Sequence, residues 1–290
     1  MKILLTGATG FIGGCFGRLA ASRGHEVIAL IRPATPSPDF PLRRVTGELN
    51  SITARELAAT GAEVCLHSAW ITTPGVYLES PENDRWRDES LQFFRRAAEA
   101  GVRHLIGLGT CIEYQITGAP LSEQRTPIAP ATRYAKAKSE LYARIESEAR
   151  AGGFSFGWGR VFYPYGPGEH PSRLCSSILL KLRRGEPVVL KTPQSCKDYI
   201  YIQDLAGAIL KVVEQKYCGA INLGTGVGTS VREIARAIGR LVGREELVTE
   251  ANPPETDPLG DVVADAGKLR SLGWRPETGL EEGIAKLLGR

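Results

Sequence analysis

Long apolar runs are missing from this sequence. No window reaches about 18 uninterrupted apolar residues, the length that a membrane-spanning helix requires. The N-terminus also lacks the separate apolar segment of a secretory signal, because its first apolar stretch leads directly into a glycine-rich turn. We therefore expect a cytoplasmic protein that has no membrane partner.

Clusters of like charge and paired cysteines are missing as well. The 36 lysines and arginines are interspersed with 32 aspartates and glutamates, and the net charge is only +4 over 290 residues. Because nucleic-acid binding needs a basic patch, we expect no nucleic-acid partner. The six cysteines are scattered without a C-x-x-C pair, which argues against a disulfide framework and against a metal site.

What the sequence does contain is an alternation of short apolar strands and amphipathic helices. Strands are predicted at Lys2–Thr6, Glu26–Ile31, Arg43–Thr46, Val64–Ser68 and Leu105–Leu108, and helices at Phe11–Arg23 and Cys175–Arg184. Apolar strands joined through helices predict an α/β fold, a doubly wound parallel sheet covered on both faces. The alternation loosens after about residue 165, where we expect a second, smaller lobe.

The glycine-rich stretch TGATGFIGG, residues 6–14, joins the first strand to the first helix. Gly7, Gly10 and Gly13 stand three residues apart, where missing side chains permit a tight turn and the close approach of a pyrophosphate. The N-terminus of the following helix would face that anion. The stretch therefore indicates a dinucleotide site, with a ligand-free turn as the alternative.

A second pattern is Y-x-x-x-K, formed by Tyr134 and Lys138. Residues four apart share one face of a helix, so the hydroxyl and the ammonium can converge. A nearby ammonium would lower the tyrosine pKa from about 10 and so ease proton exchange with a carbonyl or alcohol oxygen. The alternative is an exposed helix that happens to carry both residues.

Together these motifs resemble those of the extended short-chain dehydrogenases/reductases, in particular the NAD(P)-dependent epimerase/dehydratase family that acts on nucleotide sugars. Further segments share the resemblance almost to the end of the chain: His67-Ser68-Ala69, Thr110 to Tyr114, Tyr163 to Gly168, Lys197 to Asp204, and Gly273 to Pro276. The resemblance implies an enzyme with a Rossmann-like sheet and a smaller C-terminal α/β substrate lobe. It also implies a homodimer formed through the helix that carries Tyr134.

The resemblance suggests how the chain divides. Residues 1–165 would form the dinucleotide-binding domain, and residues 198–224 would return to it. Residues 166–197 and 225–290 would form the lobe that binds a nucleotide-sugar substrate.

The end of the second strand bears on the choice of cofactor. NAD enzymes usually place an acid there for the ribose hydroxyl, whereas an arginine can receive the 2'-phosphate of NADP. This chain has Arg32 and no acid, so NADP(H) is preferred and NAD(H) remains possible. The expected cofactor-binding residues are Gly7, Thr9, Gly10, Phe11, Ile12, Gly13, Arg32, Glu48, Leu49, Ser68, Ala69, Tyr134 and Lys138.

The resemblance also assigns catalytic and substrate-binding residues. Family members place a serine or threonine four residues before a tyrosine, here Thr110 before Tyr114, and we assign Thr110, Tyr134 and Lys138 as the catalytic triad. Lys197 stands where many relatives have an arginine for the substrate diphosphate, and Arg173 is a possible substitute. The expected substrate-binding residues are Thr110, Cys111, Tyr163, His170, Arg173 and Lys197.

The two residues after Thr110 bear on which reaction the enzyme catalyses. Sugar dehydratases of this family follow the threonine with an Asp-Glu pair, whereas this chain has Cys111 and Ile112. The favoured activity is therefore reduction of a nucleotide-linked 4-keto-6-deoxyhexose to a 6-deoxysugar. A nucleotide-sugar epimerase with tightly bound NAD(P), or one that uses Cys111 with His170, is the alternative. A third possibility is a catalytically inactive cofactor-binding sensor or scaffold.

Overall fold

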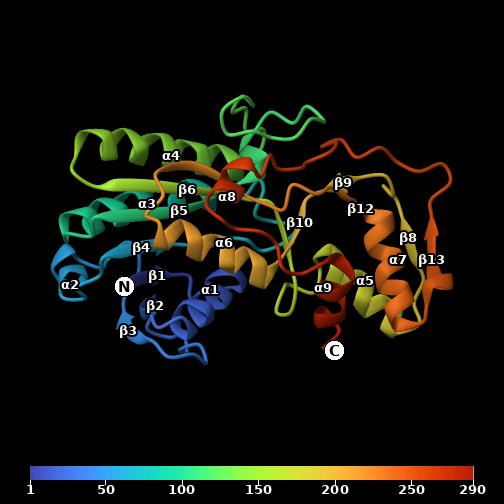
Figure 1. Ribbon diagram of the computed structural model, residues 1–290, viewed down its shortest axis with the longest axis horizontal. Helices are drawn as coiled ribbons and strands as arrows, with labels where there is room; N and C mark the ends of the chain where they lie inside the picture. Colours follow the sequence, from blue (N-terminus) through green and yellow to red (C-terminus); the bar gives the residue numbers. More distant parts are fainter. Residues whose placement is uncertain (290) are drawn as a thin grey trace.

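The computed structural model describes residues 1–289 and has two parts, a central sheet covered by helices and a smaller C-terminal group of helices and short strands (Figure 1). The sheet has seven strands in the order β11-β6-β5-β4-β1-β2-β3, and every neighbouring pair is parallel. Its strands are β1 (Lys2–Thr6), β2 (Glu26–Ile31), β3 (Arg43–Thr46), β4 (Val64–His67), β5 (His104–Thr110), β6 (Ser155–Val161) and β11 (Gly219–Leu223).

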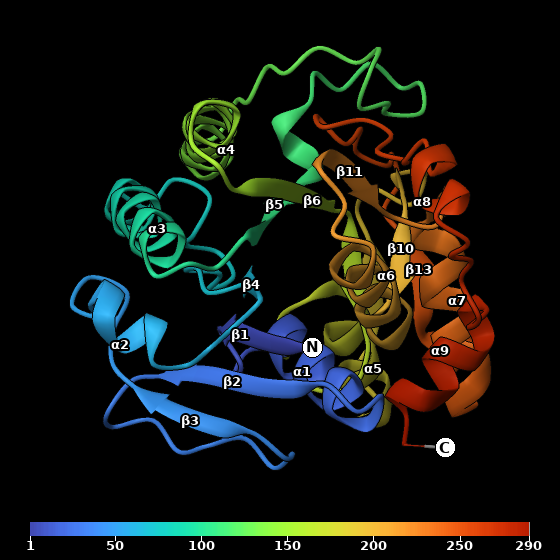
Figure 2. The same ribbon diagram turned by 60° about the vertical axis from the view of Figure 1, so that its left-hand side comes forward.

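Helices cover both faces of this sheet. On one side lie α1 and α6, and on the other lie α3 and α4 with the short α2 beside them (Figure 2). These helices are α1 (Phe11–Ser22), α2 (Ala54–Ala58), α3 (Glu82–Glu99), α4 (Arg133–Ala151) and α6 (Ile202–Glu214), and the one-turn helix η1 (Cys111–Glu113) follows β5.

Alternation along the strands supplies the two apolar layers. In β1, Ile3 and Leu5 belong to the core on the α1 and α6 side, whereas Leu4 belongs to the core on the α3 and α4 side. Successive side chains of a strand point to opposite faces, so a strand that is apolar at every position must be covered on both. The predicted α/β fold with a doubly wound parallel sheet is therefore confirmed.

The C-terminal part packs α5 against α7 and adds three two-stranded pairs, β7 with β10, β8 with β13 and β9 with β12. Its elements are β7 (Tyr163–Tyr165), α5 (Leu174–Arg183), β8 (Val188–Leu190), β9 (Cys196–Lys197), β10 (Tyr199–Tyr201), β12 (Thr229–Ser230), α7 (Val231–Val242), η2 (Glu245–Leu247), β13 (Val248–Glu250), α8 (Gly267–Ser271) and α9 (Leu280–Leu287).

Two elements from the second half of the chain lie with the first. Strand β11 forms one edge of the main sheet beside β6, and α6 packs against α1. The division of the chain into two lobes at the predicted boundaries stays a prediction. Within residues 1–289, no helix combines the length and the apolar character needed to cross a membrane.

Candidate active site

A cleft of about 970 Å³ opens at the carboxyl ends of the central strands, between the sheet and the C-terminal part. Strands β1, β2, β4, β5 and β6 all contribute residues at or just beyond their ends, which is the usual ligand position in open α/β sheets. The cleft brings together every residue that the sequence analysis assigned to cofactor or substrate: Gly7, Thr9, Gly10, Phe11, Ile12, Gly13, Arg32, Glu48, Leu49, Ser68, Ala69, Thr110, Cys111, Tyr134, Lys138, Tyr163, His170, Arg173 and Lys197.

The glycine turn leaves no room for side chains. Gly7 has a φ of +72°, and a Cβ on it would lie 2.7 Å from Ser68 Oγ. A Cβ on Gly13 would lie 2.2 Å from the carbonyl oxygen of Gly7, so α1 can pack this closely only with glycine there. Gly10 caps α1 without a side-chain hydrogen bond, and the first turn of the helix carries no acid. The free N–H groups of that turn suit a pyrophosphate.

The loop after β2 carries Arg32, which is exposed at the rim of the cleft and has no carboxylate partner among residues 1–289. Arg44 on β3, which sequence reasoning missed, holds this loop in place. Its guanidinium donates to the carbonyl oxygens of Arg32 at 3.0 Å, Pro33 at 3.3 Å and Thr35 at 2.9 Å. Arg32 is therefore presented on a loop whose backbone is already fixed.

Two further residues expected to bind the cofactor, Glu48 and Leu49, also line the cleft. Leu49 is buried, and its carbonyl oxygen accepts a hydrogen bond from the Arg96 guanidinium on α3. Glu48 is exposed and can reach a ligand without breaking a contact inside the protein.

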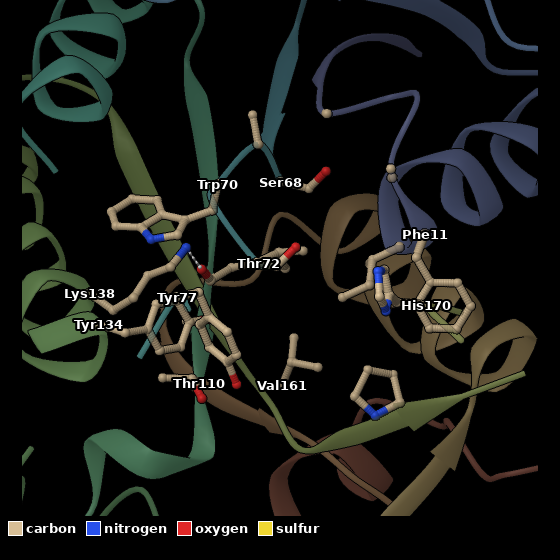
Figure 3. A pocket seen from close by; sticks show the side chains of 18 of the residues that line it. Phe11, Ser68, Trp70, Thr72, Tyr77, Thr110, Tyr134, Lys138, Val161 and His170 are labelled. Carbon is tan, nitrogen blue, oxygen red and sulfur yellow. Dashed lines mark hydrogen bonds between the residues drawn. The ribbon is translucent and has the colours of Figure 1, made fainter. Parts of the chain in front are cut away.

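Tyr134 and Lys138 lie on one wall of the cleft, opposite Phe11 and His170 (Figure 3). Helix α4 begins just before them, and Thr132 caps it by accepting a hydrogen bond from the Ala135 N–H at 3.2 Å. The Lys138 ammonium donates to the Leu108 carbonyl oxygen at 2.8 Å and lies 5.9 Å from the centre of the Tyr134 ring.

The pKa of Tyr134 differs from the sequence-based expectation. Burial raises it above the usual tyrosine range, and the nearby Tyr77, Glu113 and Cys111 add to this effect. The charge of Arg173 opposes this rise in pKa, and the Lys138 ammonium donates to the Leu108 carbonyl oxygen. Burial also lowers the pKa of Lys138 to about 7. Tyr134 is therefore a protonated phenol at neutral pH, suited to donate a proton.

Thr110 ends β5 and begins η1. Its backbone N–H donates to Glu113 Oε1 at 2.8 Å, and Glu113, fully buried, forms an ion pair with Arg160 on β6 at 2.8 Å. Trp158 Nε1 also donates to Glu113, at 3.2 Å. A buried carboxylate needs such partners, so this network fixes the backbone that carries Thr110. Sequence reasoning missed Glu113 and Arg160, although a charged residue within the apolar strand β6 is a usable signal.

The half of the cleft that the sequence analysis assigned to the substrate holds two cations in different states. Lys197 is buried and donates to Asp257 Oδ2 at 2.7 Å and to the Gly260 carbonyl oxygen. Asp257 also accepts a hydrogen bond from Ser195 at 2.6 Å, so the charge of Lys197 is largely neutralised within the protein. Arg173 lies 5.4 Å from the centre of the Tyr77 ring and has no carboxylate within ion-pair distance among residues 1–289.

Cys111 and His170 are not arranged as an acid-base pair. Burial raises the pKa of the Cys111 thiol to about 12. His170 lies in an exposed loop, where Nδ1 bonds with the Ser172 hydroxyl at 2.8 Å. Within residues 1–289 the two side chains form no contact with each other.

Two aromatic residues that sequence reasoning missed, Trp70 and Tyr77, lie against Tyr134 and Lys138. The Lys138 ammonium is 3.7 Å from the centre of a Trp70 ring, and the Tyr77 and Tyr134 rings meet edge to face at 4.9 Å between centres (Figure 3). Both belong to the loop after β4, whose irregular sequence gives no signal of its position.

The fold and this cleft define a dinucleotide-binding α/β protein of the Rossmann type. The pattern of the NAD dependent epimerase/dehydratase family matches residues 3–224, and the chain belongs to that family. It is thus an enzyme of the nicotinamide-dependent epimerase, dehydratase and reductase group, within the extended short-chain dehydrogenases/reductases.

Relatives of different activities resemble the chain over most of its length. The UDP-glucose 4-epimerase of Corynebacterium glutamicum is 26% identical, with 96% of this chain and 91% of that protein covered. The dTDP-6-deoxy-L-talose 4-dehydrogenase (NAD(P)(+)) of Kitasatospora kifunensis is also 26% identical, with 99% and 94% covered. The crystal structure of Thermus thermophilus UDP-glucose 4-epimerase in complex with NAD has a TM-score of 0.82 and 25% identity, over 99% of this chain and 97% of that one.

Proposed function

We propose that this protein is an NADPH-dependent reductase that converts a nucleotide-linked 4-keto-6-deoxyhexose to the 6-deoxysugar. One observation carries the proposal: Tyr134 faces the cleft as a protonated phenol, whereas the two side chains after Thr110 offer no second acid or base. Ile112 is apolar, and Cys111 is a buried thiol whose pKa is raised to about 12. Ketone reduction needs one proton donor, whereas elimination of water needs a further acid-base group.

Tyr134, Thr110 and Lys138 have different roles in the proposed reduction. The Tyr134 hydroxyl donates its proton to the carbonyl oxygen of the substrate, and Thr110 orients that oxygen by a hydrogen bond. When bound, the reduced nicotinamide supplies the hydride that the carbonyl carbon accepts. The phenolate left on Tyr134 recovers a proton from water, and Lys138, which lines the cleft, would hold the ribose of the cofactor.

Arg32 supports the preference for NADP(H). It lies on a loop that Arg44 holds and has no ion pair within residues 1–289, and no acidic side chain stands at the end of β2 to receive a ribose hydroxyl. A guanidinium binds a phosphate through charge-assisted hydrogen bonds, whereas it gains little from an unmodified ribose.

The exposed position of Arg173 favours a substrate that carries a negative charge. Arg173 is an exposed cation at the substrate end of the cleft, while Lys197 is already paired with Asp257. Arg173 is therefore the residue that we assign to the diphosphate. The dTDP-6-deoxy-L-talose 4-dehydrogenase of Kitasatospora kifunensis, similar over 99% of this chain, offers a precedent for a 4-keto-6-deoxysugar. Homodimerisation and a cytoplasmic location remain predictions.

The proposed function is tested by tracing the transferred hydride with deuterium. The protein is incubated with NADPH deuterated at C4 of the nicotinamide and with dTDP-4-keto-6-deoxyglucose, and in parallel with unlabelled NADPH in heavy water. We expect one NADPH consumed per product and deuterium from the cofactor at C4 of the sugar. Solvent deuterium at C3 or C5 without net loss of NADPH would favour an epimerase, and binding of NADPH without any turnover would favour a sensor.

A further inference from the structure

The loop after β4 builds a support around the catalytic lysine. Trp70 Nε1 donates to Asn83 Oδ1 at 2.9 Å, and Asn83 Nδ2 donates to the carbonyl oxygens of Tyr77 at 2.6 Å and Ser80 at 2.9 Å. Asn83 lies in the first turn of α3 and is fully buried. The amide thus fixes both the loop backbone and the orientation of the indole ring.

The fixed indole presents its face to Lys138. The ammonium, in a residue that is 4% exposed, lies 3.7 Å from the ring centre (Figure 3). It has three N–H donors, of which one bonds to the Leu108 carbonyl oxygen and another points to the ring. No carboxylate within residues 1–289 forms an ion pair with it, so the indole face in direct contact and the Glu113 carboxylate beyond ion-pair distance are the negative groups that favour its charge.

Two other titratable groups near this ammonium are uncharged at neutral pH. Tyr134, on the same helix, is held neutral by burial. His67, on β4, is also neutral, because burial and the Lys138 charge lower its pKa to about 3. The Glu113 carboxylate, which is paired with Arg160, favours the charged form of Lys138 and is the same in every Trp70 variant. A difference in the Lys138 midpoint between these variants therefore comes from the side chain at position 70.

We propose that Trp70, oriented by Asn83, is a positioning residue that holds the Lys138 ammonium against the Leu108 carbonyl and stabilises its charged form. The third donor of the ammonium is then left for the cofactor or substrate, and the Tyr134–Lys138 pair is organised before either binds. Assigning Lys138 a catalytic role rests on the proposed function, whereas the effect of Trp70 on its charge does not.

The test measures the titration of Lys138 directly. Protein carrying lysine labelled with ¹³C at Cε is titrated by NMR, and the Lys138 resonance is assigned by its absence from Lys138→Arg. In Trp70→Leu the midpoint should fall by ~1 pH unit, because a desolvated ring face stabilises a cation by roughly that amount. Trp70→Phe keeps an aromatic face and should restore at least half of the shift.

Trp86 supplies the matched control. It also lines the cleft, and its ring centre lies 6.2 Å from that of Trp70, but within residues 1–289 it forms no cation–π contact with Lys138. Trp86→Leu should leave the Lys138 midpoint at its parental value. An unchanged midpoint in Trp70→Leu, or an equal shift in Trp86→Leu, would overturn the proposal.

Fluorinated tryptophan at position 70 covers the case in which Trp70→Leu does not fold. Fluorine weakens the negative face of the ring with little change in volume, so the midpoint should fall further with each added fluorine. A Lys138 titration midpoint that does not change on fluorination would contradict the proposal. Reductase assays then separate the two hypotheses: an NMR shift without reduction of any keto-sugar supports the role of Trp70 and refutes the proposed function.

Discussion

The two halves of the cleft are built in different ways. The half that we assign to the cofactor, the cofactor half, consists mainly of backbone, namely the turn at Gly7 and Gly13 and the free N–H groups of α1. The half that we assign to the substrate, the substrate half, consists of side chains from distant segments, such as Arg173 at the start of α5 and Lys197 paired with Asp257. A backbone site is encoded by a few neighbouring glycines, whereas a side-chain site depends on which charges the fold pairs. A cation in the sequence is therefore available to a ligand only if the fold leaves it unpaired.

We expect the largest effect on turnover from a substitution at Tyr134, between the two halves of the cleft. Tyr134→Phe removes the proton donor and should lower turnover by about 10² to 10⁴ while the Kd for NADPH and the Tm stay near the parental values. Tyr142→Phe is the control, since Tyr142 lies on the same helix but bonds to Glu146 outside the cleft. Near-parental turnover in Tyr134→Phe would remove Tyr134 from the mechanism.

The substrate half is tested by its two cations. Arg173→Ala should raise the KM for a sugar nucleotide about 10- to 100-fold, because a lost charged hydrogen bond costs about 1.5 to 3 kcal/mol. Its Tm should not change, since Arg173 is exposed. Lys197→Met should instead lower the Tm, because it leaves Asp257 without its buried partner. The reverse result would show that Lys197, and not Arg173, binds the diphosphate.

The cofactor half is tested by its two arginines. Arg32→Ala should weaken NADPH about 10-fold and leave NADH unchanged, because only NADPH carries the 2'-phosphate. Arg44→Ala removes the support of the loop and should weaken NADPH less, through a smaller loss of order around Arg32. Fluorescence titration of both cofactors measures these affinities. Equal parental affinities for NADPH and NADH would contradict the assignment of Arg32.

The smallest effect is on the pH dependence of stability. Burial lowers the pKa of Lys138 from 10.5 to about 7, so between these values the unfolded chain binds a proton that the folded protein does not. Stability contributed by this site therefore rises with pH across that window, and the cost of the buried charge is complete below pH 7. Lys138→Met should raise the Tm by a few degrees at pH 6.5 relative to the parent, and by less at pH 10. An equal change at both pH values would show that the ammonium is not destabilised by burial.

Local sequence was sufficient to predict the fold class and the position of the glycine turn. Strand β1 is apolar at every position from Ile3 to Leu5, which requires cover on both faces, and the glycine spacing after it leaves room only for a ligand or a bare turn. These features were predictable because hydrogen bonding, strand alternation and steric room act between residues that are close in the chain. The Y-x-x-x-K spacing placed Tyr134 and Lys138 on one helix for the same reason.

What those side chains face depends on the folded chain as a whole. The pKa of Tyr134 is raised by burial, contrary to the expected lowering, while the Lys138 ammonium contacts Leu108 and Trp70. Lys197 is neutralised by Asp257, 60 residues away in the chain. Burial and charge pairing depend on the residues that surround a group in space, and those come from segments without any common sequence pattern. Neighbouring residues in the chain thus specify the fold and the lining of the cleft, whereas the folded surroundings set the protonation of the lining side chains and which of their charges are free to bind.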